Sequence, residues 1–207
     1  WLKALRKLCS DNGALLIFDE VISGFRLRFG GYGDLVGVDA DIITLGKIIG
    51  GGMPVGALTA SRKLMENLAP IGGVYQAGTL SGNPVSLAAG IATLKLLQDG
   101  TVYNQLEKLG EKLDEALTAK RSQHSWLQWR RIGSLFWLHL VDKDLPRDAS
   151  SIDSKAISRL DAMHGPLLER GIYLPPSAYE LCFLSASHTE SAIKTLVNGI
   201  ADVGEQF

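Results

Sequence analysis

The segment Leu15-Leu16-Ile17-Phe18 is a short apolar run that stops at two acids, Asp19 and Glu20. Four residues are too few for a buried helix, and the run is apolar on both sides, which is typical of a strand buried in a parallel sheet. Such a sheet needs helices on its faces, so this part of the chain is constrained to an α/β architecture. In open sheets of this kind ligands bind at the carboxyl ends of the strands, where Asp19 would stand.

The first hundred residues alternate strand, loop and helix patterns. The expected elements are a helix at residues 1–10 ending at Asn12-Gly13, strands at 14–18, 41–45 and 55–60, a glycine-rich loop at 23–37, and a helix at 84–98. The strands are apolar on both faces. This order favours a mostly parallel sheet covered by helices.

The pattern changes after residue 100. The expected elements are a helix at residues 101–120, aromatic-rich strands within 126–141, a helix at 151–169, a strand at 181–185 and a helix at 189–203. Alternating polar and apolar residues in the strands indicate a half-exposed sheet. We therefore expect three parts: residues 1–100 from a large α/β domain, a linking helix over 101–120, and a small α+β domain over 121–207.

Charge and composition exclude several kinds of partner. The formal net charge is −1, which gives no electrostatic reason to expect nucleic acid or an anionic membrane as partner. No apolar segment approaches the roughly 18 residues that span a bilayer. Cys9 and Cys182 show neither metal-ligand spacing nor a disulfide framework, so a reducing cytoplasm is the expected compartment. The histidines share no metal spacing, and His139 is expected to be a hydrogen-bonded core residue.

Lys47 lies after the second apolar run and directly before the glycine-rich stretch 50–52. A strand followed by a lysine and flexible backbone can present one amine in a cleft, where a partly desolvated amine becomes a nucleophile able to form a Schiff base. Asp19 and Lys47 could then face one site. The simpler alternatives are a solvated surface charge for Lys47 and a helix cap or an ion pair with Arg26 for Asp19.

Residues 74–84 place glycines and hydroxyls ahead of the helix expected at 84–98. Backbone N–H groups and a helix N-terminus can bind a phosphate. The alternative is capping, with Ser81 or Asn83 as N-cap and Pro84 at the first helical position. Capping explains Asn83-Pro84 but does not explain the run from Tyr75 to Ser81.

Taken together, these stretches resemble the class III aminotransferases, which are fold-type I enzymes dependent on pyridoxal phosphate. The likeness is strongest to the aminomutase branch of that family and runs from residue 1 to the end. The matching stretches are residues 16–21, 23–26, 44–54, 74–84, 171–174, 176–180 and 185–189. The resemblance implies a large, mostly parallel α/β domain followed by an α+β small domain.

The resemblance also implies roles for five residues around the cofactor. Lys47 would hold pyridoxal phosphate as a Schiff base and then move protons along the substrate. Asp19 would pair with the pyridinium nitrogen, and Val21 would lie against the ring. Gly78 and Thr79 would reach the cofactor phosphate of the neighbouring subunit, which implies a homodimer with shared active sites.

Tyr75 and Glu180 would line the pocket of a small-molecule substrate. The implied reaction is an internal exchange from glutamate-1-semialdehyde to 5-aminolevulinate through the pyridoxamine form of the cofactor, and it feeds tetrapyrrole synthesis. Two departures from the family pattern, Tyr32-Gly33 and Leu181-Cys182, could alter the substrate pocket.

The earlier half of the family supplies a phosphate loop, an aromatic that stacks on the cofactor, a gating loop and an arginine for the substrate carboxylate. None of these is in the chain, which opens on Trp1 within a helical pattern. We therefore expect the C-terminal portion of a longer protein, a partial site, and no complete catalyst without the N-terminal half. The alternatives are a related aminotransferase acting on another amine or a carrier-bound β-keto substrate, and a non-catalytic fragment. An intact set of Asp19, Lys47 and Thr79 argues against the last.

Overall fold

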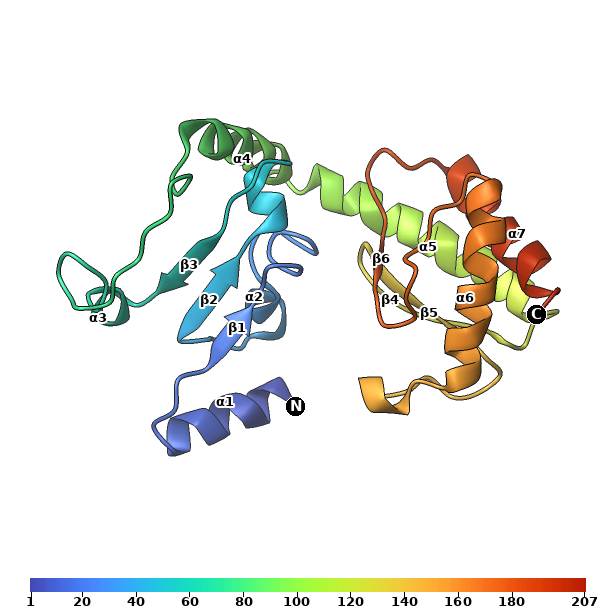
Figure 1. The fold of residues 1–207 in the computed structure, drawn as a ribbon, viewed down its shortest axis with the longest axis horizontal. Helices are drawn as coiled ribbons and strands as arrows, with labels where there is room; N and C mark the ends of the chain where they lie inside the picture. The colour runs from blue at the N-terminus through green and yellow to red at the C-terminus, as the bar shows by residue number, and fades with distance from the viewer. The chain divides into compact units, whose positions relative to one another are not determined.

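The strands of this protein form two separate sheets, each with its own helices. The computed structural model describes all residues, 1–207, and divides them into two units, Trp1–Thr101 and Val102–Phe207. Figure 1 labels the elements of both units. Each unit is described on its own below.

The first unit contains the sheet β1-β2-β3. Its elements are α1 (Leu2–Asp11), β1 (Ile17–Asp19), α2 (Tyr32–Val36), β2 (Ile42–Leu45), the 3-10 helix η1 (Lys47–Gly50), β3 (Ala57–Ala60), α3 (Arg62–Met65) and α4 (Pro84–Leu97). Strands β1 and β2 are parallel, whereas β2 and β3 are antiparallel. Three strands were expected and three are present, but β1 begins three residues later than the expected start at residue 14. The sheet is mixed, because the connection from β2 to β3 is too short for the crossover helix that a parallel pair needs.

The strands of the first unit were expected to be buried, and they are not. Ile17 in β1 is 57% exposed and Leu58 in β3 is 50% exposed. Helix α1 lies near the start of β1 and α4 lies beside η1, so these helices leave strand faces open (Figure 1). The glycine-rich stretch at 23–37 also differs from the expected loop, because it contains α2. Gly37 is the C-cap of this helix and has the left-handed conformation, with φ +64°.

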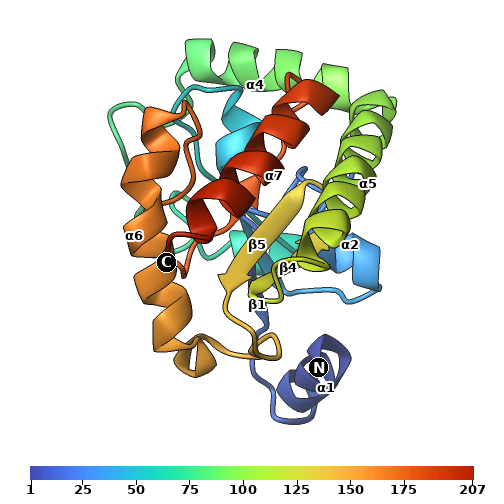
Figure 2. The ribbon, with the colours of Figure 1, turned by 90° about the vertical axis from the view of Figure 1, so that its right-hand side faces the viewer.

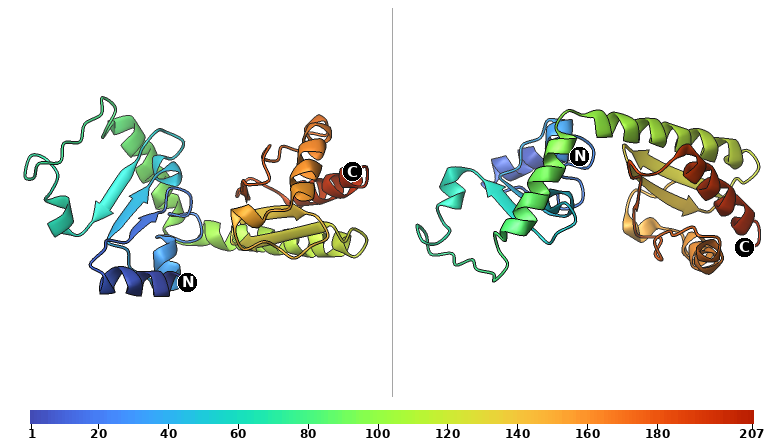
Figure 3. Two further views of the ribbon diagram at one scale, coloured as in Figure 1. Left: turned by 60° about the horizontal axis from the view of Figure 1, so that its bottom comes forward. Right: turned by 90° about the horizontal axis from the view of Figure 1, so that it is seen from above.

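The second unit contains the antiparallel sheet β4-β5-β6. Its elements are α5 (Thr101–Arg121), β4 (Leu127–Ile132), β5 (Leu135–Leu140), the 3-10 helix η2 (Ala149–Ser151), α6 (Ser154–Glu169), β6 (Cys182–Phe183) and α7 (Glu190–Gly204). Helices α5, α6 and α7 surround the β4–β5 hairpin in Figure 2, and α6 lies beside α7 in Figure 3. The expected α+β mixture is confirmed, with β6 shorter than predicted.

This second unit has an apolar core of its own. Leucines from α5 and β4 meet Met163 and Leu167 of α6 and Ile200 of α7, and all of these side chains are fully buried. Burial of each such side chain contributes roughly 1.5–3 kcal/mol relative to exposure. None of the helices in either unit combines the length and apolar composition that a membrane crossing requires.

His139 on β5 is a core residue, but it is not hydrogen-bonded as expected. His139 is 2% exposed, and neither nitrogen of its ring has a hydrogen-bond partner. The ring stacks on Trp137, with centroids 5.3 Å apart. Loss of solvation lowers the pKa of His139 below its usual value. The nearby Asp153 carboxylate raises this pKa and the Lys143 ammonium lowers it, and both effects are smaller.

The lowered pKa of His139 predicts acid sensitivity of the second unit. The folded state holds this ring neutral more strongly than the unfolded state, whose histidine pKa is about 6.5. The stabilisation is therefore complete above that pKa and is lost as the pH falls toward the lower folded value. We expect the urea midpoint to fall with pH below about 6.5, and the fall to be smaller in His139→Phe. His188→Gln is the matched control, because His188 is exposed. If both variants show the same decrease in the pH-dependent fall of the urea midpoint, His139 is not its cause.

Candidate active site

Asp19 stands at the carboxyl end of β1, opposite Thr44 of the parallel strand β2. Its Oδ1 atom accepts hydrogen bonds from the Val21 N–H at 3.1 Å and from the Thr44 hydroxyl at 3.2 Å. Its other oxygen, Oδ2, takes no part in these two bonds. The bonds come from uncharged donors, so they orient the carboxylate without neutralising it.

Lys47 is the first residue of η1, two positions after the end of β2. Its φ is +47°, in the left-handed region that side chains other than glycine rarely adopt. Such strain costs on the order of 1–3 kcal/mol and persists only where the surroundings impose it, which is most often at functional sites. Here the surroundings are Gly46, which is buried, and Val21, whose Cγ1 would lie 3.2 Å from a Cβ at position 46.

The turn that carries Lys47 is fixed from its other side by α4. Gly90 of α4 approaches the carbonyl oxygen of Ile49 so closely that a Cβ could not fit between them. A Cβ at Gly51 would lie 2.5 Å from the carbonyl oxygen of Ala89. Backbone therefore meets backbone between η1 and α4, which makes the position of the turn specific.

The structure brings Asp19, Val21 and Lys47 to one edge of the sheet. Asp19 is the last residue of β1 and Lys47 follows β2, and these two strands are adjacent and parallel, so both residues stand at carboxyl strand ends. The Lys47 side chain is exposed, so the expected desolvation of the amine is not found, because no element of this unit covers it. A cavity of about 380 Å³ adjoins Asp19 and includes Phe18 and Tyr32 among its lining residues.

Tyr75, Gly78 and Thr79 lie in irregular chain between α3 and α4, and all three are exposed. The Ser81 N–H donates to the Gly78 carbonyl at 2.9 Å, which closes a turn there. Asn83 is the N-cap of α4 and accepts from two backbone N–H groups, so capping accounts for Asn83-Pro84. No hydrogen bond in the structure joins Tyr75, Gly78 or Thr79 to Asp19 or Lys47.

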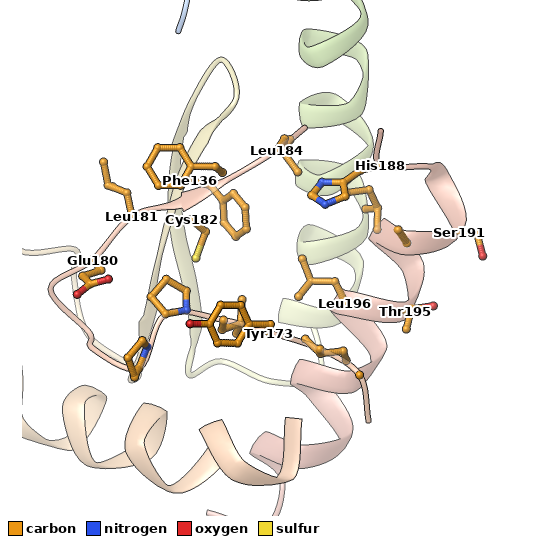
Figure 4. Close-up of a pocket in the computed structure, with 18 residues that line it drawn as sticks. Phe136, Tyr173, Glu180, Leu181, Cys182, Leu184, His188, Ser191, Thr195 and Leu196 are labelled. Carbon is orange, nitrogen blue, oxygen red and sulfur yellow. The ribbon is translucent and has the colours of Figure 1, made fainter. Parts of the chain in front are cut away.

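Glu180 belongs to the second unit and lines a cavity of about 750 Å³. Figure 4 shows Glu180 at one end of this cavity and His188 at the other. The Cys182 thiol between them is buried, which raises its pKa to about 12 and makes it a poor nucleophile. Glu180 and Tyr75, the two residues predicted to line the substrate pocket, lie in different units.

Glu20 is a residue of this region to which the sequence assigned no role beyond being the second acid after the apolar run. Glu20 is 2% exposed, and its carboxylate accepts hydrogen bonds from the glycine-rich segment that follows it. The available signal was the run of glycines and backbone amides at residues 30–33, which allows close approach to an anion. Phe25, with φ +57°, is a second strained residue in that segment that no local pattern indicated.

Comparison with known proteins shows what the chain resembles as a whole. The family model described as "Aminotransferase class-III" matches residues 1–183. The chain is 49% identical over 198 residues to a glutamate-1-semialdehyde 2,1-aminomutase of Syntrophomonas wolfei, covering 95% of this chain and 46% of that protein. It is 44% identical to the enzyme of the same name from Methylacidiphilum infernorum, covering 98% of this chain and 47% of that protein.

Solved structures agree with the sequence comparisons. An omega-transaminase from Sphaerobacter thermophilus superposes with a TM-score of 0.87 at 31% identity, covering 99% of this chain and 47% of that protein. The chain therefore spans about half the length of the relatives that it matches.

Proposed function

Because this chain belongs to the class III aminotransferase family, with the fold-type I architecture, we propose that it is the C-terminal portion of an aminomutase. The proposed reaction is the conversion of glutamate-1-semialdehyde to 5-aminolevulinate by an internal amino-group exchange, a step toward tetrapyrroles. The observation that carries the proposal is the placement of Asp19 and Lys47 at adjacent strand ends, in a chain 49% identical to a protein of that name.

The residues at this edge fit pyridoxal phosphate. Asp19 offers a carboxylate oxygen outside its two hydrogen bonds, which suits a protonated ring nitrogen. Lys47 offers an exposed amine, which suits an aldehyde, and Gly46 keeps the space beside Val21 free of a side chain. When bound, the cofactor supplies an electron sink for the carbon that loses a proton, in its pyridoxal and pyridoxamine forms.

The residues of this chain would then divide the work. The Lys47 amine would attach the cofactor and, once released, would accept and return protons at the substrate carbons through Nζ. The Asp19 carboxylate would hold a proton on the ring nitrogen, and Val21 would pack on the ring. The Asp19 carboxylate and the Lys47 amine are both carried by short backbone segments that the sheet holds in place, and this would limit their motion during proton transfer.

Other residues complete the proposal in the assembled protein. Gly78 and Thr79 would bind the cofactor phosphate of a neighbouring subunit, which makes the active form a homodimer; their exposure is consistent with this role. Tyr75 and Glu180 would line the substrate pocket.

The domain boundaries and the compartment are part of the same proposal. Residues 1–100 would belong to the large domain, 101–120 to a linking helix and 121–207 to the small domain. The N-terminal half of the protein would supply the remaining site residues. Both cysteines are free thiols, which fits a cytoplasmic location.

The direct test is a product assay on the full-length protein. Given glutamate-1-semialdehyde alone, it should form 5-aminolevulinate without an external amino donor, because the exchange is internal to one substrate. A requirement for a second amino acid would identify an ordinary aminotransferase. No turnover under either condition, with pyridoxal phosphate bound, would contradict the aminomutase reaction and favour a non-catalytic role.

A further inference from the structure

Glu20 is a buried carboxylate that holds the segment following it. Its Oε2 atom accepts from the Tyr32 N–H at 2.6 Å and from the Ser23 hydroxyl at 2.8 Å, and Oε1 accepts from the Gly33 N–H at 2.9 Å. An isolated buried carboxylate is very costly, and hydrogen bonds to an ionised group are about twice as strong as neutral ones. These three bonds therefore make the burial of Glu20 tolerable, and losing them would release the segment.

The backbone approaches Glu20 closely at two glycines. A Cβ at Gly31 would lie 2.6 Å from the Glu20 Oε1 atom. A Cβ at Gly24 would lie 2.7 Å from the Glu20 carbonyl oxygen, which itself accepts the Gly24 N–H at 2.8 Å. Residues 23–33 are thus attached to Glu20 through both its side chain and its backbone.

Glu20 and Asp19 are both hydrogen-bonded to Thr44 of β2. The Glu20 N–H donates to the Thr44 carbonyl at 2.9 Å, while the Thr44 hydroxyl donates to Asp19 Oδ1. Successive side chains of an extended segment point to opposite faces, so Asp19 and Glu20 project to opposite sides of the same backbone. A displacement of Glu20 would therefore move the backbone from which the Asp19 carboxylate projects.

We propose that Glu20 is a positioning residue for the cofactor site, which fixes residues 23–33 on one face of the sheet and thereby holds Asp19 in place on the other. The inference rests on the proposed function, since it assigns Asp19 to the cofactor ring. Glu20 itself acts only through Asp19 and through the segment that it binds.

The test is cofactor affinity in the full-length protein freed of cofactor, with pyridoxal phosphate as the probe. Glu20→Gln should weaken the affinity roughly tenfold or more, because the amide turns an N–H₂ group toward backbone N–H donors. Ser23→Ala removes one of the three bonds and should have a smaller effect of the same sign. Asp41→Asn is the matched control: Asp41 accepts the Leu16 N–H at 2.7 Å at the opposite end of the same strand pair. It should lower the unfolding temperature and leave the affinity unchanged.

A purely structural role would give a different pattern. Glu20→Gln would then unfold at a lower temperature but bind pyridoxal phosphate as the wild type does when measured on folded protein, and this result would overturn the proposal. If Glu20→Gln does not fold, Ser23→Ala is the test. Unchanged affinity for pyridoxal phosphate in Ser23→Ala would then overturn the proposal.

Amide hydrogen exchange without cofactor separates this inference from the proposed function. The Tyr32 and Gly33 amides should exchange slowly in the wild type and much faster in Glu20→Gln. If the wild type binds no pyridoxal phosphate, the proposed function fails. The exchange measurement still tests the role of Glu20. Faster exchange of the two amides in Glu20→Gln supports the attachment of residues 23–33 to Glu20, and unchanged exchange overturns that attachment.

Discussion

Lys47→Ala in the full-length protein is expected to abolish covalent attachment of pyridoxal phosphate. After dialysis the variant should lack the visible absorption of the bound cofactor, and borohydride should fix none of it to the protein. Product formation should fall by roughly a thousandfold or more, which corresponds to at least about 4 kcal/mol of lost transition-state stabilisation. The reason is that, under the proposed function, this one amine would both attach the cofactor and move the protons.

The matched control for this variant is Lys63→Ala, because Lys63 is an exposed lysine on α3 in the same unit. It should keep the absorption, the borohydride product and the activity. Covalent fixation of the cofactor to Lys47→Ala by borohydride would show that another lysine makes the attachment. In that case the strained backbone at Lys47 would need a different explanation.

Local sequence was sufficient to predict the elements whose ends depend on local chemistry. Asn83-Pro84 predicted the start of α4, and Asn83 does accept hydrogen bonds from Val85 N and Ser86 N. The helix expected at 189–203 begins within one residue of that start, because Thr189 is the N-cap of α7 and accepts from the Ala192 N–H. Such caps involve residues two or three positions apart, so the pattern that predicts them also contains the atoms that form them.

Properties that depend on distant residues could not be read in this way. The positive φ of Lys47 occurs where Gly46 lies against Val21 and η1 lies against α4, and the stretch around Lys47 does not specify these contacts. The exposure of β1 depends on what covers the strand rather than on its own residues. The buried His139 lacks hydrogen-bond partners because of how the strand and helices around it pack.

The candidate site also contains residues that local sequence predicted and one that it did not. Asp19 and Lys47 were predicted to stand at the carboxyl ends of strands, where they could face one site, and β1 and β2 are indeed adjacent and parallel. Glu20 was missed, because an acid next to another acid gives no indication of which one is buried. The hydrogen bonds that Glu20 accepts from Tyr32 and Gly33, more than ten residues away, distinguish it from Asp19.

Asp19→Asn should reduce product formation by roughly a hundredfold or more while Lys47 still attaches the cofactor. Asparagine has nearly the same shape as aspartate, and its Oδ1 atom can still accept from the Val21 N–H and the Thr44 hydroxyl. The variant therefore removes the negative charge beside the ring nitrogen and little else. Without that charge the ring nitrogen loses its proton more readily, so the cofactor becomes a weaker electron sink.

Thr44→Val separates charge from orientation at the same carboxylate. It removes the hydroxyl that donates to Asp19 Oδ1 but keeps the charge, so activity should fall only a few-fold, in line with about 1 kcal/mol for one hydrogen bond. Activity and the borohydride product are measured for both variants. Equal losses in Asp19→Asn and Thr44→Val would mean that orientation, rather than charge, is what Asp19 provides. Unchanged activity in Asp19→Asn would exclude Asp19 as the partner of the ring nitrogen.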